Sequence, residues 1–149
     1  NCYLQELPSN LESLTLHYKF DSPLPLLPIT LKHLYLHMQY NHVLPEPLPV
    51  HLETLYMGAL YSHSLDNLPQ GLLKLIIVGQ PNIDKLYELK VPLNNLPNTI
   101  ITLDILCKYN HSLDILPDSI ETLNIIFYDK NSGSANSSLD VCMYKAVYL

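Results

Sequence analysis

The chain has 149 residues, of which 48% are hydrophobic and 15% charged, and its net charge at pH 7 is −6. This length and apolar content fit one domain with a sizeable core. The eight Lys and Arg residues are scattered, so the chain lacks the basic face that nucleic acid requires. No stretch approaches the ~18 apolar residues of a membrane-spanning helix. We therefore expect neither nucleic acid nor a membrane among its partners.

The three cysteines, Cys2, Cys107 and Cys142, are odd in number and lack the spacing of a metal knuckle. They predict reduced thiols in a cytosol-like, cytoplasmic compartment. Because the chain begins with Asn1 rather than Met, we expect it to be an excerpt or a processed form of a longer protein.

A Leu-Pro pair recurs along the chain and indicates an internal repeat. Successive pairs are separated by 20, 21, 20, 28 and 20 residues, so one step carries an insertion. The pairs are Leu7-Pro8, Leu27-Pro28, Leu48-Pro49, Leu68-Pro69, Leu96-Pro97 and Leu116-Pro117. A unit of about twenty residues cannot bury a core alone, so successive units must stack and share their apolar faces.

Each repeat follows the pattern L-P-x-x-L-x-x-L-x-L, and its L-x-L pair (Leu14 and Leu16 in the first copy) predicts a strand with one buried face. Proline and the short remaining length favour an extended or 3₁₀ return segment over a helix. The predicted fold class is a β-dominated, leucine-rich-repeat-like solenoid over residues 1–128. It has about six turns of 20–21 residues, a parallel concave sheet and short irregular or 3₁₀ convex segments.

The long step between the fourth and fifth repeats places an insertion at about residues 79–92. Ile83, Leu86 and Leu89 are spaced three apart, which predicts a short helix there. Two readings of the insertion remain open. It packs back as a tolerated loop on the convex side, or it protrudes as an interaction loop.

The C-terminal part departs from the repeat. Residues 129–138 are polar and predict a flexible linker. Residues 139–149 are too apolar to remain in solvent and predict a segment that caps the last turn or mediates self-association.

The segments "YNHSLDILPDSI" (residues 109–120) and "VPLNNLPNTI" (residues 91–100) resemble FNIP repeats, a leucine-rich variant found in giant DNA viruses and social amoebae. The resemblance covers residues 4–126. It implies a buried aromatic spine formed by Phe20, Tyr40, Tyr61 and Tyr109. It also implies polar side chains that hydrogen-bond turn backbone, namely Asp21, Asn41, Ser62 and Asn110.

Functional residues of a solenoid are expected at the positions that vary between copies on the sheet face. One outward row reads Ser13, His33, Thr54, Lys74, Thr102 and Thr122. The next reads Thr15, Tyr35, Tyr56, Ile76, Asp104 and Asn124. The third reads His17, His37, Gly58, Val78, Leu106 and Ile126. The predicted partner-binding residues are His17, His33, Tyr35, His37, Tyr56, Ile76, Val78, Asp104 and Leu106.

We expect no metal, cofactor or catalytic residue. His17, His33 and His37 share a face, but no Cys, Asp or Glu lies in the same cluster to complete a ligand set, and His33 and His37 are ~13 Å apart along an extended strand. The pairs Ser62-His63 and His111-Ser112 occupy turns without an acid or an oxyanion hole.

Three functions remain open. The first is a non-enzymatic module that binds a protein partner through the concave face, and the resemblance implies client recognition for a ubiquitin-ligase adaptor. The second is a self-associating structural or virion-associated protein, located in the host cytoplasm or the virion. The third is carbohydrate binding, in which the Tyr and His rings stack on sugars.

Overall fold

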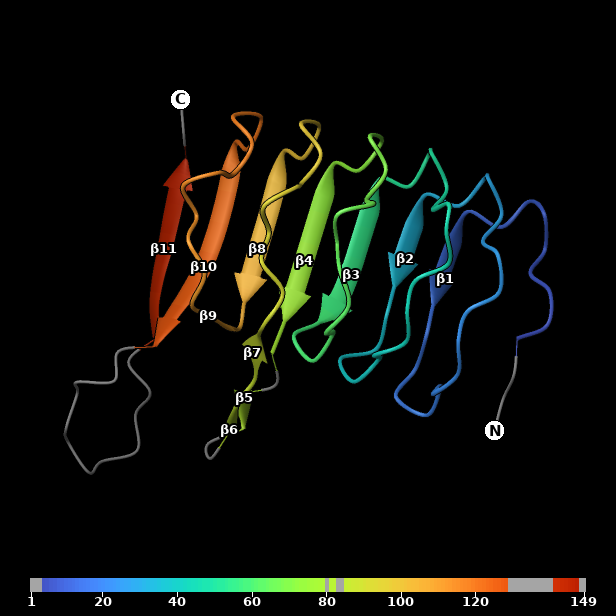
Figure 1. Cartoon of the computed structure of the whole chain (residues 1–149), viewed down its shortest axis with the longest axis horizontal. Coiled ribbons are helices and arrows are strands. Elements are labelled where there is room, and N and C mark those ends of the chain that lie inside the picture. Colours follow the sequence, from blue (N-terminus) through green and yellow to red (C-terminus); the bar gives the residue numbers. More distant parts are fainter. Residues whose placement is uncertain (1–3, 80, 83–84, 129–140, 148–149) are drawn as a thin grey trace.

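The computed structural model describes residues 4–79, 81–82, 85–128 and 141–147. Within these ranges the chain forms strands and turns but no helix. The chain winds into coils that stack side by side, and each coil contributes one strand to a common sheet (Figure 1). The predicted fold class, a strand-dominated solenoid with a parallel sheet and non-helical return segments, is confirmed.

The main sheet has seven strands in the order β1-β2-β3-β4-β8-β10-β11. Its strands are β1 (Ser13–Thr15), β2 (His33–Tyr35), β3 (Thr54–Gly58), β4 (Lys74–Val78), β8 (Thr102–Leu106), β10 (Thr122–Tyr128) and β11 (Val141–Val147). The first six are parallel and define coils one to six, whereas β11 is antiparallel to β10. The L-x-L pattern sets this register, because Leu14 pairs with Leu34 and Leu34 pairs with Leu55.

Every coil enters its strand through the same turn. The carbonyl of the proline accepts a hydrogen bond of 3.0–3.2 Å from the amide three residues later. The donors are Leu11, Leu31, Leu52, Leu72, Ile100 and Ile120. Proline fits the first turn position because that position needs a carbonyl acceptor and no amide donor.

The interior of the coil stack is filled by the repeated leucines and aromatics. Leu34, Leu55 and Leu75 on consecutive strands have no exposed surface. Tyr40 and Tyr61 are also buried, as the aromatic spine requires. Phe20 and Tyr109 belong to the same spine but are half-buried, and the rings of Phe20 and Tyr40 stack with centroids 6.3 Å apart.

The insertion between coils four and five forms short strands. β5 (Pro81–Asn82) pairs with β6 (Lys85–Leu86) in an antiparallel hairpin, and β7 (Glu88–Leu89) pairs in parallel with β9 (Lys108–Tyr109). The helix predicted from the spacing of Leu86 and Leu89 is therefore wrong, and Ile83 lies outside the described residues. Pairing with coil five buries Leu89 completely, which a helix lying free of that coil would not achieve.

The insertion combines the two expected arrangements. β7 packs back onto the solenoid, and the Tyr87 carbonyl accepts a hydrogen bond of 3.0 Å from the Lys108 amide. The β5–β6 hairpin extends beyond the ends of the main strands (Figure 1).

The last described strand, β11, runs along the edge of β10 and pairs with it from Thr122↔Val147 to Tyr128↔Val141. It lies in the segment expected to cap or to associate. The predicted linker at 129–138 lies outside the described residues. Among the described residues, no helix has the length and apolarity needed to cross a membrane.

Candidate functional site

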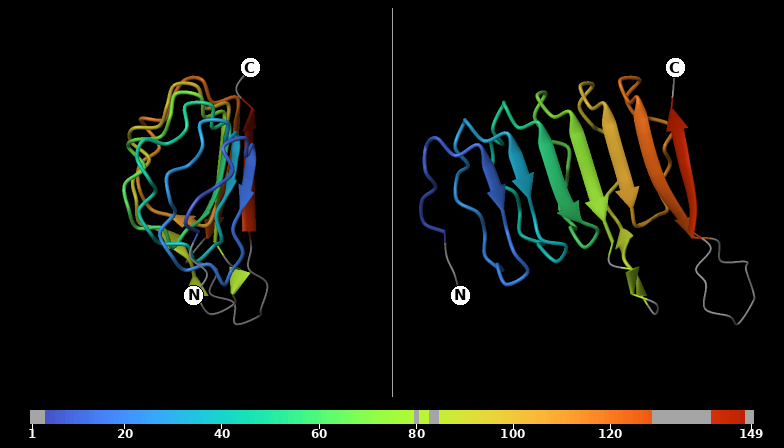
Figure 2. Two further views of the ribbon diagram at one scale, coloured as in Figure 1. Left: turned by 90° about the vertical axis from the view of Figure 1, so that its right-hand side faces the viewer. Right: turned by 180° about the vertical axis from the view of Figure 1, so that it is seen from behind.

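The outer sheet face is the surface of the main sheet that points away from the core, and none of the return segments that the structure describes crosses it (Figure 2, right). The register places the predicted rows on this face in order. Tyr35 lies beside Tyr56, Tyr56 beside Ile76, and Ile76 beside Asp104. In the third row, Val78 lies between Gly58 and Leu106.

The N-terminal half of this face contains an aromatic hollow. The rings of Tyr35 and Tyr56 are 6.3 Å apart and inclined at 42°. They border an open depression of about 450 Å³, which we call the tyrosine hollow. Its lining residues are Thr15, Leu16, Tyr35, Leu36, His37, Met38 and Tyr56. Three of the predicted partner-binding residues therefore meet at one concave place, and sequence reasoning missed Met38.

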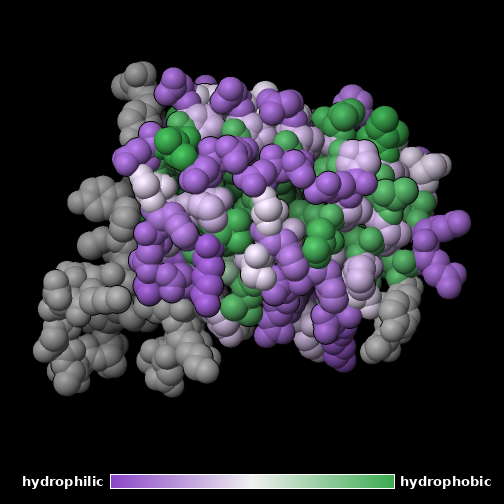
Figure 3. All heavy atoms as spheres, viewed as in Figure 1, coloured by the Kyte–Doolittle hydropathy of each residue, from purple (hydrophilic) through white to green (hydrophobic). Residues whose placement is uncertain are grey.

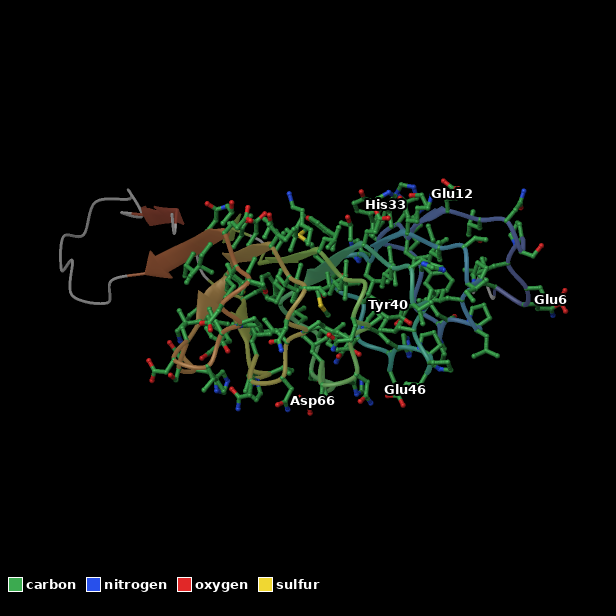
Figure 4. The ribbon with its side chains drawn as sticks, turned by 90° about the horizontal axis from the view of Figure 1, so that it is seen from above. Glu6, Glu12, His33, Tyr40, Glu46 and Asp66 are labelled. Carbon is green, nitrogen blue, oxygen red and sulfur yellow. The ribbon has the colours of Figure 1, made fainter. Side chains whose placement is uncertain are left out.

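The histidines at this end of the face are not equivalent. His17 is exposed, whereas His37 is half-buried beside the Tyr18 ring, with centroids 6.0 Å apart. Burial, and secondly the positive charge that His17 carries when protonated, lower the pKa of His37. The Gln39 amide donates to Nδ1 of His37 over 3.2 Å, which favours the neutral ring. His33 lies on the sheet side, as Glu12 does (Figure 4).

No group of three or more His, Cys, Asp or Glu side chains is placed to hold a metal ion in the part of the chain that the structure describes. The arrangement of His17, His33 and His37 offers hydrogen-bonding and titratable groups beside aromatic rings, which suits recognition of a surface.

The C-terminal half of the face is less open than the sequence suggests. Ile76, Val78 and Leu106 are half-buried, because neighbouring rows pack against one another. Asp104 is held by its neighbours on both sides. Its carboxylate accepts a hydrogen bond of 2.6 Å from Asn124 and lies 3.9 Å from Nζ of Lys74. Asp104 thus links three strands within the sheet.

A ladder of histidines on the return side was missed by sequence reasoning. Its members are His42, His63 and His111, and each ring packs on the tyrosine two residues earlier with centroids 5.4–5.5 Å apart. Nε2 of His63 donates to the carbonyl of Asn41, and Nε2 of His111 to that of Lys90, both at 2.9 Å. The sequence does contain a signal for this ladder, because His recurs two positions after the aromatic residue of the repeat.

The polar residues that follow the aromatics also join neighbouring coils. They were expected to bond turn backbone and are Asp21, Asn41, Ser62 and Asn110. Asn41 accepts from the amide of Ser62 at 2.8 Å and from its hydroxyl at 3.1 Å. Asp21 instead pairs with His42 at 2.8 Å, and Asn110 donates to Glu88. The expectation therefore holds for Asn41 and is wrong for Asp21, Ser62 and Asn110, whose side chains bond side chains of a neighbouring turn.

These contacts account for the serine–histidine pairs. Ser62 and His63 both bond Asn41 of the preceding coil. Ser112 donates to Asp114 at 2.6 Å, while His111 bonds the carbonyl of Lys90. In neither pair is the serine bonded to the histidine, so the described geometry contains no nucleophile–base contact at these positions.

Hydroxyl groups form two further series between coils. Thr99 and Ser119, each two residues after a repeat proline, donate to the carbonyls of Leu72 and Ile100 at 2.9 and 2.8 Å. The Tyr109 hydroxyl accepts from the Leu93 amide at 3.0 Å. The polar residues at repeated positions therefore join neighbouring coils, whereas the residues that vary between copies lie on the outer sheet face.

Comparison with protein-family models, with curated proteins and with solved structures finds no significant match to this chain.

Proposed function

We propose that the chain is a non-enzymatic protein-interaction module that binds a partner through the outer sheet face. The observation that supports this proposal is the tyrosine hollow. Tyrosine rings supply large contact areas at low conformational cost, and they are enriched among the residues that dominate binding energy. The rings of Tyr35 and Tyr56 belong to parallel strands of a continuous sheet, so little ordering is needed when a partner docks.

The narrower assignment follows from the repeat pattern. The L-P-x-x-L-x-x-L-x-L spacing and the Tyr-Asn-His segments support a leucine-rich repeat of the FNIP subgroup. The resemblance extends the proposal to client recognition for a ubiquitin-ligase adaptor. It also favours a viral protein that acts in the host cytoplasm.

Site-specific photo-crosslinking tests the binding face. A benzoylphenylalanine placed at Tyr56 should yield partner adducts in lysate of the source cells, and Tyr35→Asp in the same chain should remove them. The matched control carries the crosslinker at Ile115, a 53% exposed residue on the return side. Equal adducts from both positions, or adducts that persist in Tyr35→Asp, would reject the outer sheet face as the binding surface. Loss of adducts on addition of free glycans would favour carbohydrate binding instead.

Self-association is the second candidate, and a hollow of about 380 Å³ at coil six favours it. It is lined by Leu113, Leu116, Pro117, Asp118, Ile120 and Leu123. Another copy that filled this hollow would build a structural or virion-associated assembly. Sedimentation velocity decides the matter, because a monomer that persists at high concentration rejects assembly by this chain.

A further inference from the structure

The return side of coils one to three carries the most exposed aliphatic side chains of the described residues. Leu26 is 71% exposed, Ile29 65%, Val43 60% and Val50 59%. We call these four residues the return-side patch. Apolar residues are more frequent over the N-terminal half of this side than over the C-terminal half (Figure 3). Single exposed aliphatics are ordinary, but four on adjacent coils form a surface that water solvates poorly.

The repeat places members of the patch next to one another. Ile29 and Val50 each follow the proline of a Leu-Pro pair, so they occupy equivalent positions on consecutive coils. Consecutive coils are ~4.8 Å apart in a parallel stack, which is side-chain contact distance. Leu26 lies on the other side of the same Leu27-Pro28 pair as Ile29.

A small notch lies at the Val43 end of the patch. It measures about 30 Å³ and lies between the return segment of residues 40–52 and the next return segment, with Val43, Pro45 and Glu46 among its lining residues. An aliphatic group of a partner that entered the notch would contact Val43 and approach the Glu46 carboxylate. Prolines at both ends of these return segments fix φ and hold the patch in one shape.

The charges within the return segments of the patch have a single sign, and the nearby Lys32 is paired with Glu12 at 3.2 Å. Segments 4–11, 20–31 and 40–52 form the return side of these coils and contain Glu6, Asp21 and Glu46 but no Lys or Arg. Glu6 and Glu46 are exposed and lie one coil before and one coil after Leu26. Figure 4 shows Glu6 at the N-terminal end and Glu46 on the side opposite the sheet.

We propose that the return-side patch docks a protein segment that presents aliphatic side chains flanked by Lys or Arg, as a basic amphipathic helix does. Basic groups on both flanks of such a segment complement Glu6 and Glu46, while its aliphatics cover Ile29 and Val50. A second copy paired through the same patch would oppose these carboxylates to one another. An anionic membrane would be repelled by them. This site is independent of the tyrosine hollow, which lies on the other side of the coils.

Peptide titration tests the proposal on the full chain. The probe is a fluorescent 14-residue helix of Leu and Lys with one apolar face, and its counterpart replaces every Lys with Glu. We expect the Lys peptide alone to bind. Ile29→Thr with Val50→Thr should weaken binding about tenfold or more. Glu6→Gln with Glu46→Gln should weaken it and reduce its dependence on salt. Both pairs change exposed side chains, so circular dichroism should be unaltered.

Matched controls separate this site from general acidity and from the tyrosine hollow. Ile115→Thr with Asp114→Asn makes one aliphatic change and one carboxylate change on a C-terminal coil and should leave affinity unchanged, as should Tyr35→Asp. Equal weakening by the control pair, or equal binding of the Glu peptide, overturns the proposal. The proposal is also overturned if Ile29→Thr with Val50→Thr abolishes self-association, since the occupant would then be another copy. It is likewise overturned if this variant loses binding to phosphatidylserine vesicles, since the occupant would then be a membrane.

Discussion

Gly58 is the position on the outer sheet face at which the structure leaves no room for a side chain. A Cβ atom added to Gly58 would lie 1.9 Å from the carbonyl oxygen of Met38 and 2.4 Å from its Cα. Real Cβ contacts essentially never fall below 3.0 Å, so Gly58→Ala requires coils two and three to separate by more than 1 Å. The obstacle is backbone, which cannot rotate away as a side chain can.

The expected destabilisation follows from what this separation breaks. The amide of Leu36 in coil two donates to the carbonyl of Tyr56 in coil three at 2.8 Å, and this bond lies two residues from Gly58. Loss of one buried hydrogen bond costs about 1–3 kcal/mol, and overpacking adds about 1–3 kcal/mol. We therefore expect Gly58→Ala to lower the free energy of unfolding by about 2–6 kcal/mol, a large share of the ~5–15 kcal/mol typical of a domain.

Urea denaturation followed by circular dichroism measures this effect in a series of three glycines. Gly71→Ala should be the next most harmful, since its Cβ would lie 2.3 Å from the Val50 carbonyl oxygen. Gly79→Ala should be mildest, because its nearest obstacle is the side chain of Cys107 at 2.9 Å. A Gly58→Ala protein as stable as the parent, or an inverted order, would refute the close approach of these coils.

Three further predictions concern buried polar groups. Tyr109→Phe should cost about 1 kcal/mol of stability, because the Leu93 amide loses its acceptor. Tyr40→Phe should cost less, because the Tyr40 hydroxyl approaches the Leu24 backbone without forming a well-aligned hydrogen bond; equal losses would contradict this assignment. Burial lowers the pKa of His37, so the stability that its neutral ring contributes is present above pH ~6.5 and is lost as the pH falls through the lowered pKa. His37→Gln should therefore reduce the loss of stability that urea denaturation measures between pH 7.5 and pH 5. An unchanged pH profile would count against this role of His37. Burial raises the pKa of the Cys107 thiol to about 11. Iodoacetamide at pH 8 should therefore leave Cys107 unalkylated, as detected by peptide mapping, until urea unfolds the chain. Rapid alkylation of the native protein would contradict the burial of Cys107.

The coil architecture could be predicted from the sequence because its determinants are local and repeated. The L-x-L pair fixes which strand face is buried, and the constant step fixes the register. Leu34 therefore pairs with Leu55, and Leu55 with Leu75, as the alignment of the copies requires. A one-residue slip would have turned every leucine of a strand toward solvent, so the pattern leaves little freedom.

The insertion could not be predicted because its structure is decided by a distant partner. A spacing of three between Leu86 and Leu89 is compatible with a helical face, and nothing within the segment reveals the strand that it meets. That strand is β9, which lies about twenty residues further along the chain. Pairing with Lys108 and Tyr109 satisfies the backbone of β7 and buries Leu89 at once, and these gains exceed a weak local preference.

The exposure of the face was overestimated for a related reason. Sequence position shows that Ile76 and Asp104 point outward, but not how far their neighbours cover them. In a parallel stack each side chain is flanked on both sides at ~4.8 Å, so long side chains shield one another. The ion pair of Lys74 with Asp104 and the hydrogen bond from Asn124 are consequences of this proximity.

The histidines show how repeat register separates structural from functional candidates. His42, His63 and His111 recur at one position, and their rings lie against tyrosines of the spine. Because Nε2 of each ring also bonds a residue about one repeat earlier, a partner could engage these nitrogens only by breaking contacts between turns of the stack. His17 and His37 occupy one row of the outer sheet face but differ in burial, and only His37 borders the tyrosine hollow. Composition alone gives all of them the same weight, whereas register places the recurring set in contacts between turns and leaves the varied set as candidates for recognition.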